Sequence, residues 1–216
     1  MGARAIDDLR LLARRDEELA AQAAGLSELD AECSRIRERA EAIDGFFARY
    51  PDEAARRVAA VTEARAELET RRTDLGAAQS ALAAAKDEEA RTYARHALER
   101  AEDHVRVADA ALDRAELANR ELEEEAAALP AEVPELERRA RAIADQVAEV
   151  PAPGEGPRAL VEWSSGAHAE LFVAASQIAT RRDAVIREAN ELATAVLAEP
   201  TYGSTVAQVV SRVENH

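Results

Sequence analysis

Apolar residues recur at every seventh position of residues 11–50, which read LLARRDEELAAQAAGLSELDAECSRIRERAEAIDGFFARY. A second apolar row lies three positions further on, although it begins only at about residue 25. Two rows with this spacing form the a and d seam of a coiled coil, so we expect the row residues Leu29 and Ile36 to be buried. The first row is Leu12, Leu19, Leu26, Cys33, Ala40 and Phe47, and the second is Leu29, Ile36, Ile43 and Tyr50.

The composition favours helix along the whole chain. Only 3% of the 216 residues are aromatic, so a thick globular core would have few large side chains to fill it. Ala, Leu, Glu and Arg, all strong helix formers, dominate instead. We therefore predict an all-α fold of long antiparallel coiled-coil hairpins with a small C-terminal helical module.

The charge of the chain excludes several classes of partner. The formal net charge is −15, which repels nucleic-acid phosphates and anionic lipid headgroups. Acidic residues often stand four positions before Arg, as in Glu67/Arg71, a spacing typical of solvated helix faces. The chain has no apolar run of about 20 residues, and its first residues lack the apolar stretch of a signal peptide. We expect a cytoplasmic protein that binds no nucleic acid, and the acidic charge also disfavours binding to a membrane.

Prolines divide the predicted helices, because Pro is unfavourable inside a helix. Pro51 suits the first turn of a new helix, which predicts a hairpin bend near Tyr50. The segments that follow from the prolines are residues 1–50 as the first coiled-coil helix, 51–129 as a long central helix, 130–157 as a short helix with a Pro/Gly linker, and 158–216 as the C-terminal helices.

The apolar rows of the long central helix shift register once. Sixteen residues separate Leu82 from Leu98, which rotates the row by roughly 160° around the helix. The simplest interpretation is a change of partner at about residues 86–94. The row Val61, Leu68, Leu75 and Leu82 would then pack against residues 26–47, and the row Leu98, Val105 and Leu112 against segments beyond Pro130. Pairing of either row with a second chain, as a homodimer, is the alternative.

The C-terminal segment predicts one long and one short helix. A helix from about Arg158 to Glu199 has apolar residues at seven-residue spacing, and a short helix with one apolar face follows Pro200. The spaced residues are Leu171, Ile178, Val185 and Leu192 in the long helix, and the apolar face of the short helix holds Val206, Val209, Val210 and Val213.

No pattern of catalytic or metal-binding residues is present in the sequence. The four histidines form no pair with metal-ligand spacing, and we expect the one face that gathers His96, Glu99 and Asp103 to be solvated. Cys33 lies in the coiled-coil seam, where we expect a buried thiol. Gly-rich phosphate loops and Ser/His/Asp constellations are missing. We predict no catalytic residues, no cofactor, no metal and no small-molecule substrate.

Two aromatic features are candidate contacts for a protein partner. Phe46, Phe47 and Tyr50 would lie at the predicted hairpin tip, where they either cap the coil or dock a partner. Trp163 either anchors a partner or seals the C-terminal module against the long helix.

The predicted function is that of a non-enzymatic structural or adaptor protein, a coiled coil that acts as spacer or scaffold. Its partners would be other proteins or a second copy of itself. The alternative is a membrane-associated or membrane-remodelling coiled coil, which would need a basic or strongly amphipathic face.

Overall fold

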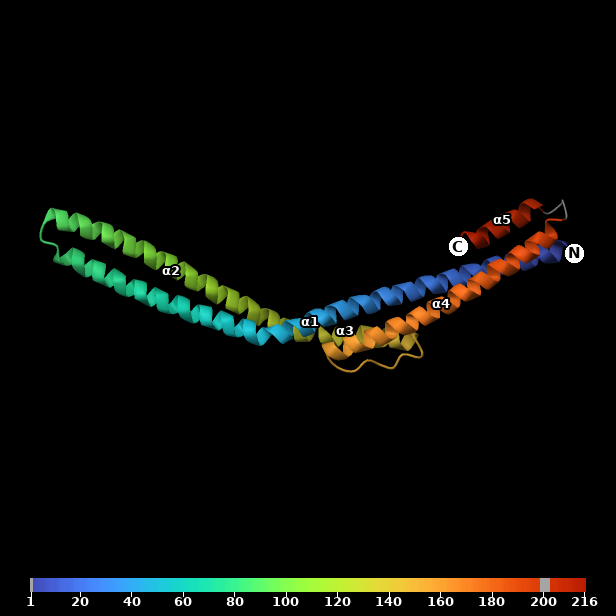
Figure 1. Ribbon diagram of the computed structural model, residues 1–216, viewed down its shortest axis with the longest axis horizontal. Coiled ribbons are helices and arrows are strands. Elements are labelled where there is room, and N and C mark those ends of the chain that lie inside the picture. Colours follow the sequence, from blue (N-terminus) through green and yellow to red (C-terminus); the bar gives the residue numbers. More distant parts are fainter. Residues whose placement is uncertain (1, 199–202) are drawn as a thin grey trace. The chain divides into compact units, whose positions relative to one another are not determined.

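A computed structural model describes residues 2–198 and 203–216 (Figure 1). Every regular element in these residues is helical, which confirms the predicted all-α class with long paired helices. The elements are α1 (Gly2–Ala84), α2 (Glu88–Ala128), the short 3-10 helix η1 (Leu129–Ala131), α3 (Val133–Gln146), α4 (Pro157–Val196) and α5 (Gly203–Glu214). The predicted helix end at Glu199 and the break at Pro200 fall outside the described residues.

The predicted hairpin bend near Tyr50 is wrong, because α1 continues through Pro51. Proline removes one backbone hydrogen bond from a helix interior, but the apolar row of α1 keeps its seven-residue phase across it. Phe47 is followed by Ala54 and Val61 at the same spacing. The seam therefore stays on one side of the helix, and its packing outweighs the local cost of the proline.

The turn of the hairpin lies at residues 85–87, where the sequence pattern shifts register. Asp87 caps the new helix, since its Oδ1 accepts a hydrogen bond of 2.8 Å from the backbone N–H of Ala90. Glu88 and Glu89 follow in the first turn of α2, where negative charge is favourable. The register shift thus marks a turn, and the interpretation that an unbroken helix changes partner there is wrong.

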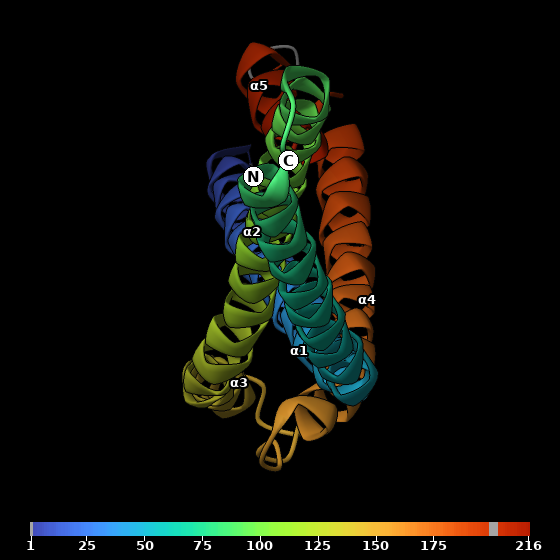
Figure 2. The same ribbon diagram turned by 90° about the vertical axis from the view of Figure 1, so that its left-hand side faces the viewer.

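The chain forms two compact units, and residues 43–132 make up unit 2. This unit is an antiparallel hairpin of α1 and α2, which run side by side in both views (Figures 1 and 2). Arg65 pairs with Glu116 at 2.8 Å and Arg72 with Asp109 at 3.8 Å across the two helices. The row from Val61 to Leu82 therefore lies against α2. Its predicted packing against residues 26–47, and that of Leu98, Val105 and Leu112 against segments beyond Pro130, are both wrong.

Unit 1 comprises residues 1–42 and 133–216. The N-terminal part of α1 runs antiparallel to α4, with Asp16 paired to Arg182 and Asp30 to His168. Helix α3 packs against α4 toward one end of this pair, and α5 packs against α4 toward the other. A core shared by α1, α4 and α5 includes Leu9, Leu12, Val185, Ala189, Val206 and Val213.

Candidate protein-binding surfaces

Three aromatic side chains form a cluster on the surface of α1 in unit 2. The ring centroids of Phe46 and Phe47 are 5.3 Å apart in an edge-to-face arrangement, and Tyr50 lies 5.8 Å from Phe46. Phe47 is 37% exposed, while Phe46 and Tyr50 are half-buried. We call Phe46, Phe47 and Tyr50 the aromatic cluster. Because α1 is continuous, the cluster lies within a helix and not at the hairpin tip where the sequence placed it.

A groove of about 370 Å³ adjoins the aromatic cluster. Phe46 and Tyr50 line it together with Leu122, which α2 contributes near its C-terminal end. Its other lining residues carry both signs of charge, and the Arg49 side chain folds back so that its Nε donates to the carbonyl of Gly45. An apolar floor with a mixed polar rim is the usual composition of a protein–protein contact.

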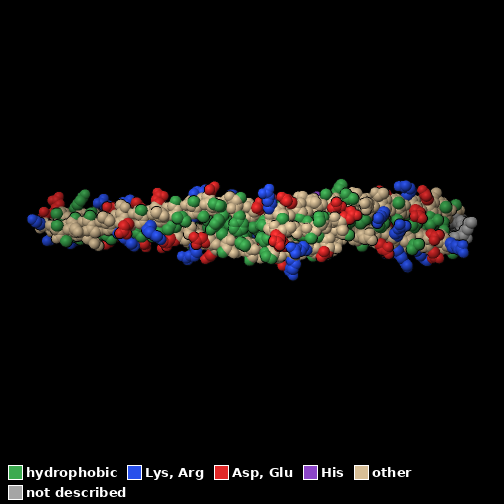
Figure 3. All heavy atoms as spheres, turned by 90° about the horizontal axis from the view of Figure 1, so that it is seen from below, with side chains coloured by type: hydrophobic (Ala, Val, Ile, Leu, Met, Phe, Trp, Pro, Cys, Tyr) green, Lys and Arg blue, Asp and Glu red, His purple; other side chains and the backbone are tan. Residues whose placement is uncertain are grey.

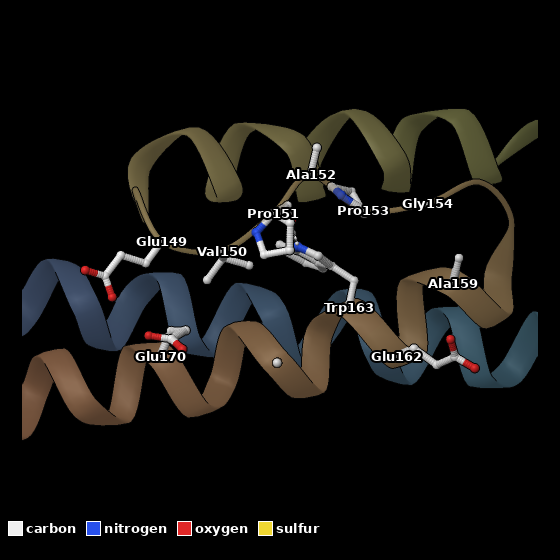
Figure 4. Close-up of a pocket in the computed structure, with 11 residues that line it drawn as sticks. Glu149, Val150, Pro151, Ala152, Pro153, Gly154, Ala159, Glu162, Trp163 and Glu170 are labelled. Carbon is white, nitrogen blue, oxygen red and sulfur yellow. Dashed lines mark hydrogen bonds between the residues drawn. The ribbon is translucent and has the colours of Figure 1, made fainter.

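Trp163 is buried against the linker that precedes α4. Only 8% of its surface is exposed, and its indole Nε1 donates a 3.1 Å hydrogen bond to the carbonyl of Pro151. Figure 4 shows Pro151 lying over the indole, with Val150 and Pro153 beside it. The segment that Trp163 holds by its hydrogen bond is the linker, whereas the sealing role expected from the sequence was against the long central helix.

The linker itself is fixed at its end by Gly156. This residue has a φ of +87°, a conformation that L side chains rarely adopt, and its N–H donates to Glu137 Oε1 at 2.6 Å. The folded linker and α4 enclose a pocket of about 410 Å³. Its floor is Trp163 with apolar linker residues, and three carboxylates of Glu149, Glu162 and Glu170 stand around it.

Two polar contacts of unit 1 were not predicted from the sequence. Asp16 is fully buried, and Arg182 contacts both of its carboxylate oxygens, with Nε at 2.8 Å from Oδ1. Asp30 Oδ1 lies 2.5 Å from Nδ1 of His168. The sequence gives one indication of them, because Arg15 and Gln22 occupy positions where the second apolar row should have begun. Polar residues at these positions indicate a more polar seam there.

The residues with reactive or metal-binding chemistry are dispersed. Cys33 is buried as predicted, with 1% of its surface exposed. Burial raises the pKa of its thiol to about 11, and the negative charges of Asp30 and Glu32 add to this effect. His96 and Glu99 are exposed and lie 3.3 Å apart, whereas Asp103 pairs with Arg106. Within residues 2–198 and 203–216, no group of three or more metal-ligating side chains converges.

Acidic and basic side chains stand close together on the molecular face shown in Figure 3. Many are partners within one helix, such as Glu67 and Arg71 at 2.6 Å. None of the described helices combines the length and the apolar character that a membrane span requires. Comparisons of the chain with family models, with curated proteins and with solved structures find no match.

Proposed function

We propose that this protein is a non-enzymatic, cytoplasmic coiled-coil adaptor or scaffold that binds partner proteins through surfaces on its helices. The single observation that supports the proposal best is the aromatic cluster. Phe46, Phe47 and Tyr50 contact one another on a helix surface and adjoin a groove that Leu122 of α2 helps to form. Tyr and aromatic residues in general are enriched where partners bury apolar surface, and the remaining surface of the chain is rich in charge.

The geometry of the cluster suits an extended or helical segment of another protein. Phe47 is partly exposed, and the groove beside it offers a place for an apolar side chain of the partner. Arg49, Arg56, Asp52 and Glu53 around the groove would give the rim polar contacts of both signs. The net charge of −15 supports a protein partner over a nucleic acid, because the long-range field repels phosphate.

The pocket over Trp163 is the second surface included in this proposal. Trp163 holds the linker in place, and the apolar floor that it forms with the linker residues is bordered only by acidic charge, from Glu149, Glu162 and Glu170. A partner that used this pocket would therefore contribute an apolar side chain with a basic neighbour.

The test is affinity capture from the native cell with quantitative mass spectrometry. The bait carries Phe46→Ala, Phe47→Ala and Tyr50→Ala together, and the control bait carries Val58→Ala, an exposed apolar residue on the same helix. We expect the triple variant to lose specific partners by roughly 30-fold or more, because central aromatic contacts are typically worth at least about 2 kcal/mol. Identical sets of captured proteins from both baits would overturn the proposal that the aromatic cluster binds a partner.

A further inference from the structure

The exposed side of α4 is unusual for this chain, because it carries no charge over its middle part. At its edge, Phe172 lines a groove of about 210 Å³ together with Ala23 and Leu26 of α1. We call Ser165, Ala169, Phe172, Val173, Ser176 and Thr180 the outer face of α4, and all six are exposed. Phe172 is 70% exposed and Val173 is 49% exposed. In residues 163–180 only Glu170 carries a full charge, whereas 33% of the whole chain is charged.

We propose that the outer face of α4 is a self-association surface, through which two copies of the chain pair with their α4 helices antiparallel. Residues 163–180 make five helical turns, about 27 Å of helix, and the outer face along these turns consists of apolar or small neutral side chains. Small side chains let two helices approach closely, and Phe172 and Val173 supply the apolar area at the centre. A neutral centre with charges at both ends is the arrangement of a protein interface with a polar rim.

The charges at the two ends of this face identify a second copy as the occupant. Arg158 and Glu162 precede the neutral part, and Asp183, Arg187 and Glu191 follow it on the same side of the helix. When Val173 of one copy lies opposite Ser176 of the other in antiparallel helices, Arg158 faces Glu191 of the second copy. Glu162 then faces Arg187 of the second copy. Twofold symmetry repeats both opposite-charge pairs, while a parallel pairing in register would place each charge opposite itself.

The charged residues beyond the neutral part are available for such contacts. No ion pair or side-chain hydrogen bond involves Arg187 or Glu191 in the described part of the chain, although they are four residues apart. Arg158 and Glu162 contact each other at 3.5 Å, with side chains 85% and 72% exposed. Charges on a helix pair choose partner and orientation more than they add affinity, so they fix the antiparallel register here.

This surface belongs to unit 1 and the aromatic cluster to unit 2, so the inference goes beyond the adaptor role and can fail while the aromatic cluster still binds a partner. Phe172 does not line the pocket over Trp163, so Phe172→Glu tests self-association apart from that pocket as well. The first measurement is the mass of the full chain by sedimentation equilibrium. We expect twice 23.3 kDa for the wild type, and a dissociation constant at least about tenfold higher for Phe172→Glu. Val107→Glu is the matched control, because Val107 is 65% exposed on α2 and should leave the dimer unchanged.

Charge exchange tests the orientation. Arg187→Glu should weaken the dimer, because it places two acids opposite each other, and adding Glu162→Arg should restore it by re-creating the pair with reversed signs. Circular dichroism of each variant should match the wild type, since all the substituted side chains are exposed. A monomeric wild type at concentrations up to about 0.1 mM would overturn the proposal. A dimer that Phe172→Glu leaves intact, or a double charge variant that stays dissociated, would also overturn it.

Discussion

Units 1 and 2 use the same seven-residue row of α1, but they bury it to different depths. In unit 1 the row residues Leu12, Leu19 and Cys33 are buried. In unit 2 Leu68 is buried, whereas Val61, Leu75 and Leu82 of the same row are only half-buried. The residue types do not explain the difference, because leucine is the commonest residue of the row in both units.

The difference comes from the number of helices around the row. In unit 1, α5 covers the α1–α4 pair near Leu9 and α3 covers it near Ile36, and both residues are completely buried. In unit 2 the row meets α2 alone. Unit 1 supplies an internal control: Leu26 and Leu29 are half-buried beside a groove of about 480 Å³, where α3 ends at Gln146. A two-helix seam therefore stays partly wet, and a third helix completes its burial.

Depth of burial should translate into local stability. Burying a leucine or isoleucine side chain fully contributes about 1.5–3 kcal/mol, and a half-buried one contributes correspondingly less. We therefore expect the hairpin of unit 2 to open at a lower free energy than the core of unit 1.

The largest expected effect is that of a charge in the deeper seam. Ile36→Asp should lower the free energy of unfolding by about 3–5 kcal/mol, because an unpaired carboxylate would replace a side chain that is completely buried. Leu75→Asp in the hairpin should cost no more than about 2 kcal/mol, since its carboxylate can reach water. Urea unfolding followed by circular dichroism compares the two variants. Equal losses would show that the third helix does not control the depth of the seam.

The next effect concerns the buried ion pair of unit 1. Asp16→Ala should destabilise the protein by about 2–4 kcal/mol, because it leaves the Arg182 guanidinium partly buried without its partner. Glu17→Ala is the matched control on the neighbouring residue, whose pair with Arg212 is solvent-exposed, and it should cost less than about 1 kcal/mol. Replacing both members, as Asp16→Leu with Arg182→Met, should recover most of the loss. A double variant as unstable as Asp16→Ala would contradict this account.

The helical class could be predicted from the sequence because the seven-residue row needs no knowledge of its partners. The position of the hairpin could have been found as well. The row stays in phase across Pro51 and loses phase only between Leu82 and Leu98. The phase of the apolar row therefore locates the hairpin turn better than the position of the proline does. Pro51 shows why: a helix tolerates a proline when packing on both sides of it maintains one seam.

Other features could not be derived, because they depend on where a third helix lies. Ile36 is fully buried as predicted, while Leu29 of the same row is half-buried beyond the end of α3. The burial of Asp16 and the exposure of Phe172 likewise require the packing of α4 and α5 on α1. Of the candidate contacts, the aromatic cluster is on the surface at a different place from the one predicted, and Trp163 is buried under the linker.

The titration of the Cys33 thiol should make the stability of unit 1 depend on pH. The pKa of its thiol in the folded protein is about 11, above the ordinary value of 9.0, so folding favours the protonated form. This contribution is fully present below pH 9 and is lost as the pH rises to about 11, on the order of 1–2 kcal/mol. The melting temperature of the wild type should therefore fall more steeply between pH 9 and about 11 than the melting temperature of Cys33→Ala. A control with Ser80→Cys added to Cys33→Ala, which puts an exposed thiol on the hairpin, should follow Cys33→Ala. Parallel curves for wild type and Cys33→Ala would show that the thiol is not held neutral by the fold.

The smallest expected change in stability comes from a glycine substitution in the hairpin, and it tests most directly whether the two units open separately. A methyl group added at Gly76 in α1 would meet no atom within 4 Å, so Gly76→Ala should stabilise the helix by about 0.5–1 kcal/mol. Gly156→Ala is the opposite control, since its φ of +87° makes any side chain unfavourable and should cost about 1 kcal/mol.

Native-state hydrogen exchange locates these changes along the chain. If the hairpin opens first and alone, Gly76→Ala should increase protection of the α2 amides near Ala101 and leave those of α4 near Val185 unchanged. Gly156→Ala should affect the amides of unit 1 and spare those of α2. Helix α1 passes through both units as one helix. If Gly76→Ala increased the protection of the α2 and α4 amides equally, α1 would couple the two units into one cooperative unfolding transition. The shallower seam of the hairpin would then not make the hairpin the less stable unit.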